Sequence, residues 1–181
     1  MFNFFMNGLS IIEPKRFFDD RGFFEEVWSS NYFSSIGIND LFVQDNFSYS
    51  ENKFTIRGLH AQAPPAAQSK LVRCNKGSIF DVVVDIRKKS MHYGKYFGIE
   101  LSAENGKQLY IPSGFLHGFI TLEPKTEISY KCSKPYYPST EISVNYKDKD
   151  LAIKWPRSRK SFTVSEKDSL AKSFDELISP F

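Results

Sequence analysis

Apolar and polar residues alternate along much of this chain with the period that is typical of β-strands. The clearest example runs from Ser78 to Arg87. Its apolar positions Phe80, Val82, Val84 and Ile86 alternate with Asp81, Val83, Asp85 and Arg87. This period of two predicts a half-buried strand whose other face carries charge. By the same reasoning, further strands are predicted at residues 70–74, 97–101, 108–111, 115–122 and 127–132.

Turn-forming residues predict how these strands connect. Residues 75–77 are expected to turn between the first two strands, residues 103–106 to form a hairpin loop, and residues 123–125 to join another strand pair. Helical patterns are short and occur at residues 30–36 and from Ser165, where Ser165-x-x-Asp168 is a capping signature. Short strands with few helices predict an all-β sandwich or barrel.

Length and composition narrow the class of protein. A chain of 181 residues that is 41% hydrophobic is expected to form a single globular domain over residues 1–181. A net charge of +3 is too small to indicate a nucleic-acid partner, and no stretch approaches the roughly 20 apolar residues of a membrane span. The first six residues lack the basic region and the cleavage pattern of a signal peptide. Cys74 and Cys132 lack the spacing of a zinc or redox site. We therefore expect a cytoplasmic protein with two reduced cysteines.

Two of the three histidines lie in motifs that suggest chemistry. His60 lies in the segment Arg57-Gly-Leu-His-Ala-Gln62, and His117 lies in Pro112-Ser-Gly-Phe-Leu-His-Gly-Phe119. Arg57 accompanies the first histidine, and Lys70 follows it. A general base among fixed positive charges suits an anionic substrate or an anionic intermediate.

The second of these motifs matches a motif of the cupin barrels. The match is Gly106-x5-Pro112-x-Gly114-x2-His117. Metal-binding cupins supply His-x-His and a following Glu from their first motif, whereas this chain has His60-Ala-Gln62 there, and His92 lies in a polar turn. Because a metal site usually needs three or four ligands, we expect the barrel without a catalytic metal or another cofactor.

A longer series of motifs resembles one family. In chain order they are Asp19-Asp-Arg-Gly-Phe-Phe24, Phe42-Val-Gln-Asp-Asn46, Ile56-Arg-Gly-Leu-His60, Gln68-Ser-Lys-Leu-Val-Arg73, Asp81-Val-Val-Val-Asp-Ile-Arg87, Leu101-Ser-Ala-Glu-Asn105, the motif from Pro112 to Phe119, Tyr130-Lys131 and Ser165-Glu-Lys-Asp168. Together they resemble the dTDP-4-dehydrorhamnose 3,5-epimerase family over about Lys15 to Asp168. The resemblance implies a cupin-like jelly roll and an isomerase acting on a nucleoside-diphosphate 4-keto sugar.

The resemblance also implies catalytic roles. His60 would be the base, held by Asp168, while Lys70 would face the O4 enolate and Tyr130 would return a proton from the opposite face. A histidine ordinarily titrates near pH 6.5, so a neutral imidazole suits a base at cytoplasmic pH. Each residue has a simpler alternative: His60 in a turn, Asp168 as a helix cap, Tyr130 in a core and Lys70 facing solvent.

Further positions match residues that bind substrate in the family, and their functional groups suit a sugar nucleotide. Arginine forms paired hydrogen bonds to phosphate oxygens, which suits a diphosphate, and an aromatic ring such as Tyr136 stacks on a base. The resemblance implies a homodimer whose N-terminal segment reaches the neighbouring subunit. The implied binding residues are Arg21, Glu26, Gln44, Asn46, Arg57, His117, Tyr136, Glu141 and Lys167.

Two departures from the family pattern leave the substrate open. Ala61 replaces the usual Tyr after the base, and Ser143-Val-Asn-Tyr146 replaces a more usual Gly-Ile-x-Trp. If these positions contact sugar or base, a 4-keto heptose or a GDP-linked sugar would fit. We expect inversion at C3, C5 or both during the synthesis of a surface polysaccharide such as O-antigen or capsule. The alternatives are a single-centre epimerase, a non-catalytic sugar-binding cupin and a metal-dependent cupin.

Overall fold

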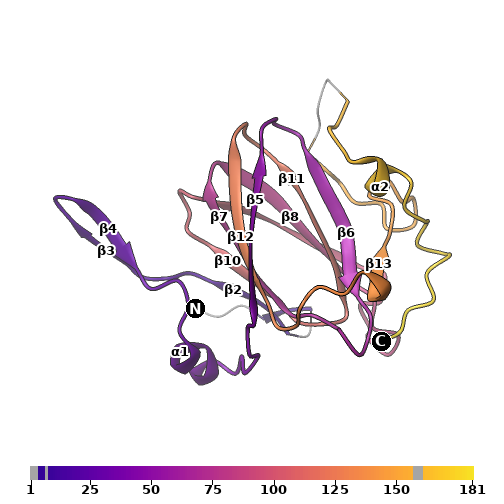
Figure 1. The fold of residues 1–181 in the computed structure, drawn as a ribbon, viewed down its shortest axis with the longest axis horizontal. Helices are drawn as coiled ribbons and strands as arrows, with labels where there is room; N and C mark the ends of the chain where they lie inside the picture. Colours follow the sequence, from indigo (N-terminus) through magenta and orange to yellow (C-terminus); the bar gives the residue numbers. More distant parts are fainter. Residues whose placement is uncertain (1–3, 7, 157–160) are drawn as a thin grey trace.

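The computed structural model of this protein describes residues 4–6, 8–156 and 161–181, and two facing sheets dominate it (Figure 1). The six-stranded sheet contains, in spatial order, β1 (Phe4–Phe5), β2 (Leu9–Ile12), β10 (Gln108–Ile111), β7 (Lys70–Lys76), β12 (Thr126–Cys132) and β5 (Gln44–Ser50). The five-stranded sheet contains β13 (Glu141–Ser143), β6 (Ile56–Gln62), β11 (Phe115–Thr121), β8 (Ser78–Asp85) and β9 (Tyr96–Ser102). The predicted all-β, cupin-like sandwich is confirmed. The expectation that the first six residues are not a signal peptide concerns a segment that lies partly outside the described residues.

The remaining elements are short. A separate hairpin of β3 (Arg16–Asp19) and β4 (Gly22–Glu25) extends away from the sandwich (Figure 1). Helix α1 (Ser30–Ser35) begins at a Ser29 cap, and α2 (Glu166–Ser169) begins at the predicted Ser165 cap. A 3-10 helix covers Pro138–Thr140. In the described residues, no helix is long and apolar enough to cross a membrane.

The predicted strand positions are confirmed, but their predicted pairing is wrong. β7 and β8, β9 and β10, and β11 and β12 are consecutive in the chain, yet the two members of each pair lie in different sheets. The turns at 75–77, 103–106 and 123–125 therefore carry the chain from one sheet to the other. Turn residues signal a change of direction, and they do not say whether the next strand pairs alongside or packs opposite. Among the consecutive strands from β7 to β12, β8 and β9 do pair with each other, and they are antiparallel.

The sandwich is filled by apolar side chains at one end and is open at the other. Residues such as Val72, Val83 and Leu109 form the core between the sheets. A second apolar layer, which includes Val82 and Val84, packs the outer face of the five-stranded sheet under the C-terminal segment. Burying each such side chain contributes about 1.5–3 kcal/mol, so both faces of β8 are stabilised by burial.

The expected charged face of β8 is buried. Asp81 and Asp85 are both 0% exposed, because β8 lies between two strands and its alternate face points into the sandwich. Buried charges need partners. Asp85 accepts hydrogen bonds from Arg87 and Ser90, and Asp81 is bonded to His117. The alternation was therefore read correctly as a strand, but the charged positions do not mark a solvent-facing surface.

Candidate active site

The open end of the sandwich contains two adjoining cavities of about 530 and 350 Å³. Both are lined by His60, Lys70 and Tyr130, so they form two lobes of one site. We call the larger one the sugar lobe and the smaller one the base lobe, after the parts of a sugar nucleotide that the family resemblance implies for them. His60 lies on β6 of the five-stranded sheet, whereas Lys70 and Tyr130 lie on β7 and β12 of the six-stranded sheet. The two sheets thus present different groups to opposite sides of the same space.

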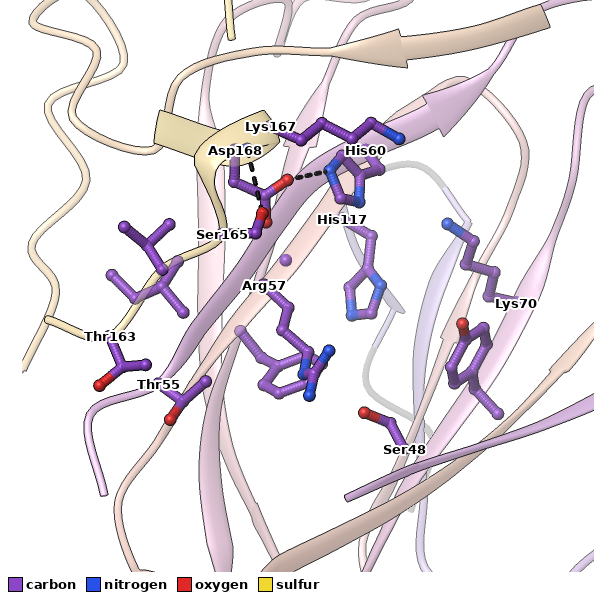
Figure 2. A pocket seen from close by; sticks show the side chains of 15 residues that line it. Ser48, Thr55, Arg57, His60, Lys70, His117, Thr163, Ser165, Lys167 and Asp168 are labelled. Carbon is purple, nitrogen blue, oxygen red and sulfur yellow. Dashed lines mark hydrogen bonds and ion pairs between the residues drawn. The ribbon is translucent and has the colours of Figure 1, made fainter. Parts of the chain in front are cut away.

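His60 is paired with a buried carboxylate. Its Nε2 lies 2.8 Å from Oδ1 of Asp168 (Figure 2). Oδ2 of Asp168 accepts from the Gly58 amide at 3.1 Å. The Asp168 amide donates to Oγ of Ser165 at 3.1 Å, so the Ser165 helix cap and the pairing of Asp168 with His60 exist together. Burial alone would raise the pKa of Asp168, but the hydrogen bonds from His60 and Gly58 outweigh it and lower that pKa. Asp168 is therefore a carboxylate that holds the imidazole in one orientation.

A close backbone contact fixes where His60 emerges. Gly58 has φ +114°, and a Cβ on it would lie 2.6 Å from Cα of Gly118. Only glycine allows strands β6 and β11 to approach this closely. In the register of these strands, His60 pairs with His117, so both histidines enter the cavity side by side.

Lys70 and Tyr130 face the histidines from the other sheet. Figure 2 shows His60 and Lys70 reaching into the same space from different strands. Burial lowers the pKa of Lys70, although the neighbouring thiol and carboxylates, including Asp81, act in the opposite direction. Burial also raises the pKa of Tyr130, which favours its protonated form. The solvent-facing alternative for Lys70 does not apply, because Lys70 lines both lobes.

A second histidine–carboxylate pair lies beside the first. Nε2 of His117 lies 2.9 Å from Oδ2 of Asp81, and both residues are buried. Oδ1 of Asp81 has no hydrogen-bond partner among the described residues. Sequence reasoning did not select Asp81. The signal in the sequence was the composition of the strand. Asp81 lies between apolar residues, and a strand this apolar is typically buried, so its carboxylate needs a buried partner.

Arg57 enters the sugar lobe with part of its guanidinium already bonded. Its Nη2 donates to the Tyr49 carbonyl at 3.0 Å, and its Nε lies 3.3 Å from Oγ of Ser50. These contacts orient the side chain along the wall formed by β5 and β6 (Figure 2). A guanidinium held in this way can bind the oxygens of a phosphate group.

The base lobe collects most of the other binding residues suggested by the sequence. Gln44 and Asn46 line its wall from β5, and Oε1 of Gln44 accepts from the Tyr136 amide at 3.0 Å. The Tyr136 hydroxyl donates to Glu141 at 2.8 Å, and Lys167 donates to both oxygens of Glu141 at 2.6 and 2.7 Å. Burial alone would raise the pKa of Glu141, but the bonds from Lys167 and Tyr136 lower it. The Tyr136 ring remains half exposed at the mouth of the lobe.

Arg21 and Glu26 are not brought to this site. Arg21 is fully exposed near the end of the β3–β4 hairpin, where it pairs with Asp19 at 2.5 Å. Glu26 is exposed directly after β4. Neither residue lines either lobe in this chain.

The two departures from the family pattern lie mainly in the apolar layers. Ala61 borders the base lobe, but it is buried and packs with the layer on the outer face of the five-stranded sheet. Val144 belongs to the same layer, and Tyr146 is buried in a neighbouring cluster. Val144 and Tyr146 are therefore packing positions, whereas Ala61 both packs in this layer and borders the base lobe.

The donor groups do not assemble a metal site. Among the residues that the structure describes, no group of three or more His, Cys, Asp or Glu side chains could hold a metal ion. His60 and His117 are each bonded to a carboxylate instead. His117, the histidine of the second cupin motif, is thus held by a carboxylate of a neighbouring strand in its own sheet.

Known proteins resemble this chain over most of its length. The profile of a family described as dTDP-4-dehydrorhamnose 3,5-epimerase matches residues 4–176. The dTDP-4-dehydrorhamnose 3,5-epimerase of Salmonella typhimurium is 47% identical and covers 93% of this chain and 91% of that protein. A dTDP-6-deoxy-D-glucose 3,5-epimerase from Legionella pneumophila, solved in complex with dTDP-4-keto-L-rhamnose, has a TM-score of 0.92 at 44% identity and covers 97% of this chain and 92% of that one. A 3'-monoepimerase from Streptomyces bikiniensis, solved with dTDP-quinovose, has a TM-score of 0.87 at 30% identity and covers 96% and 87%.

Proposed function

This chain belongs to the dTDP-4-dehydrorhamnose 3,5-epimerase family, and we propose that it inverts C3 and C5 of a dTDP-linked 4-keto-6-deoxyhexose. It is an isomerase of the nucleotide-sugar epimerase class. The observation that carries the proposed mechanism is the placement of a His–Asp pair on one wall of the cavity and Lys70 with Tyr130 on the other. An epimerase needs a base and an acid on opposite faces of the sugar ring, with a cation between them for the enolate.

His60 is the base in this mechanism. With Nε2–H donated to Asp168, the lone pair on Nδ1 is available to take the proton from the carbon next to the ketone. The electron pair of the broken C–H bond becomes the carbon–carbon double bond of the enolate. The carbonyl π electrons move to O4, and the imidazolium that forms is stabilised by the adjacent carboxylate of Asp168.

Lys70 and Tyr130 complete the inversion. The Lys70 ammonium stabilises the negative charge on O4, as a fixed cation does best inside a cavity that excludes water. Tyr130 then donates its hydroxyl proton to the same carbon from the opposite face, and the ketone re-forms. The raised pKa of Tyr130 keeps this hydroxyl protonated until the carbanion character of the enolate accepts the proton. A second round at the other carbon gives the doubly inverted product.

The base of the nucleotide occupies the mouth of the base lobe, while its diphosphate reaches Arg57 in the sugar lobe. Arg57 binds the diphosphate, and Tyr136 stacks on the base, while Glu141 and Lys167 frame the mouth where the two lobes meet. Gln44, Asn46 and His117 supply further polar groups to the walls. The buried positions of Ala61 and Tyr146 favour the family's own substrate class over a GDP-linked heptose.

The enzyme works as a homodimer in this proposal. The β3–β4 hairpin carries Arg21 away from its own site, and its phenylalanines, such as Phe18 at 75% and Phe24 at 70%, are exposed. Apolar surface of this kind marks an association surface, and a partner's cavity would give Arg21 and Glu26 a diphosphate to bind. Sedimentation velocity should show a dimer at micromolar concentration, and a monomer under those conditions would contradict this part of the proposal.

Compartment and pathway complete the proposal. Cys74 and Cys132 are both free and buried, which fits a reducing cytoplasm. There the product would feed the assembly of a rhamnose-containing surface polysaccharide.

A single-centre epimerase is the second candidate function. It is favoured by the likeness to a 3'-monoepimerase, because the same proton-transfer groups serve one carbon or two. A non-catalytic sugar-binding cupin is disfavoured by the His60–Asp168 pair, and a metal-dependent cupin is disfavoured by the donor set.

Isotope exchange tests the proposal directly. The protein is incubated in D2O with dTDP-4-keto-6-deoxyglucose and, for comparison, with GDP-linked 4-keto sugars, and NMR locates deuterium on the ring. We expect deuterium at both C3 and C5 of the dTDP sugar, whereas deuterium at one carbon alone would identify a single-centre enzyme. His60→Asn should abolish exchange at every carbon, a loss of about 10²- to 10⁴-fold, while thymidine diphosphate still binds. Unchanged exchange in that variant would refute the assignment of the base.

A further inference from the structure

A buried glutamine on the same strand as His60 contacts the loops around the base lobe. Gln62 lies two residues after His60 on β6, so both side chains point to the same face of the sheet and line the base lobe. It is only 4% exposed. The proton-transfer mechanism above does not use it, although a buried amide requires hydrogen-bond partners.

The Gln62 amide is bonded only to backbone groups of two loops. Its Nε2 donates to the Ala66 carbonyl at 2.8 Å and to the Pro135 carbonyl at 3.1 Å. Its Oε1 accepts from the Tyr137 amide at 2.6 Å. Both donors of the amide are therefore used, and only one orientation of the group satisfies all three contacts.

Two of these contacts flank Tyr136. Gln62 holds the residue before Tyr136 through Pro135 and the residue after it through Tyr137, while Gln44 accepts the Tyr136 amide itself. In addition, Gln62 is paired in register with Glu141, which accepts the Tyr136 hydroxyl. The exposed ring at the mouth thus rests on a backbone that Gln62 fixes on both sides.

We propose that Gln62 is the positioning residue of the nucleotide subsite, setting the Tyr136 ring for stacking on the base. This inference rests on the proposed function, because it takes Tyr136 as the residue that contacts the base. Gln62 does not touch the reacting carbons. It acts through the 133–137 loop, so its loss should weaken nucleotide binding and leave proton transfer in bound substrate intact.

Two variants separate the parts of the Gln62 interaction. Gln62→Met keeps the volume of the side chain but removes all three hydrogen bonds, and it leaves the buried Ala66 carbonyl and the more exposed Pro135 carbonyl without this donor. Gln62→Glu keeps the acceptor for the Tyr137 amide and places a second oxygen against the carbonyls of Ala66 and Pro135. Thr140→Val is the matched control. It removes a hydroxyl bond to the Tyr137 carbonyl in the same loop, while the Thr140 amide still donates to that carbonyl.

The readouts are the affinity for thymidine diphosphate by calorimetry, kcat and KM with the dTDP sugar, and Tm. In Gln62→Met, the Kd for thymidine diphosphate and KM should each rise about tenfold or more, as expected when a buried carbonyl loses its donor and the loop around Tyr136 loses two further hydrogen bonds. The value of kcat should stay within about twofold, because Gln62 does not touch the reacting carbons. A twofold change is small beside a tenfold loss of binding. Gln62→Glu should weaken thymidine diphosphate binding in the same direction, and Thr140→Val should match the wild type.

Several results would overturn the inference. They are an unchanged Kd for thymidine diphosphate in both Gln62 variants, a fall in kcat without a rise in KM, or an equal loss of affinity in Thr140→Val. A purely structural role would lower Tm in Gln62→Met without separating KM from kcat. If the wild type itself failed to bind thymidine diphosphate, the proposed function would be wrong, and the test distinguishes that result from a failure at Gln62.

Discussion

Gly58 is the position where a single methyl group should disturb this fold most clearly. Its φ of +114° lies in a region that side chains rarely adopt. A Cβ there would meet Cα of Gly118 at 2.6 Å and the His117 carbonyl oxygen at 2.7 Å. Both are backbone atoms of β11, so no flexible side chain can move aside to make room. Gly58→Ala must therefore separate β6 from β11 at the point where both histidines enter the cavity.

The expected loss of stability has two parts. Holding alanine at this φ costs about 1–3 kcal/mol, and forcing a methyl group into a packed contact costs about 1–3 kcal/mol more. The central expectation is therefore a loss of about 4 kcal/mol, a large share of the 5–15 kcal/mol by which domains are usually stable. For a chain of this size, such a loss lowers Tm by roughly 8–16 °C.

A matched control isolates the packing part. Gly22 has a similar φ of +128°, but a Cβ on it would meet nothing within 4 Å. Gly22→Ala should therefore show only the conformational cost of about 1–3 kcal/mol. Thermal unfolding of both variants, followed by circular dichroism, measures the difference. If the two variants lost the same stability, the close approach of β6 and β11 would not be a packing constraint and this reasoning would fail.

Three further predictions concern chemistry, acid stability and metals. Tyr130→Phe should still exchange ring hydrogen in D2O but yield little inverted product. Lys70→Ala should instead slow exchange itself by about 10²- to 10³-fold. If Tyr130→Phe lost both exchange and inversion, Tyr130 would not be the far-face acid. Burial would raise the pKa of Asp85, but hydrogen bonds from Arg87 and Ser90 lower it, so its stabilising contribution is present above the ordinary aspartate pKa and is lost as pH falls through the lowered folded value. Asp85→Asn should thus lower Tm at pH 7 and flatten the fall of Tm between about pH 5 and pH 2, and parallel Tm curves would contradict this. Chelator treatment should leave turnover unchanged, and activity that vanished with chelator and returned with iron, zinc or manganese would refute the mechanism.

The strand patterns located β7 to β12 to within a few residues, because a period of two is a local property, but they did not locate β1 to β6 or β13. Strand β8 shows what this signal lacks. Asp81 and Asp85 alternate with apolar residues just as solvent-facing residues would, yet both are buried. A buried face differs from a solvent-facing one only in what packs against it, and distant parts of the chain supply that packing. The same limit applies to strand pairing, which turn residues alone do not decide.

The candidate site was accessible to sequence reasoning only where motifs carry chemistry. The segment around His60 signals a base, and the capping box at Ser165 places Asp168 at the start of a helix. Nothing local says that this aspartate contacts a histidine 108 positions away. Gln62 and Asp81 were missed for the same reason. The partners of Gln62 are backbone groups of two loops, and the partner of Asp81 is a histidine on another strand.

The segment from His60 to Lys70 supplies groups to both sides of the site, because the chain passes from one sheet to the other within it. His60 lies on β6 and Lys70 on the next strand, β7. Had β6 and β7 formed a hairpin, as consecutive antiparallel strands often do, both side chains would have lain in one sheet and faced the same side of a bound sugar. Because β7 belongs to the opposite sheet, Lys70 reaches the cavity from the other wall, next to Tyr130 of β12. The crossing between sheets from β6 to β7 is therefore what places the proposed base and the proposed enolate cation on opposing walls.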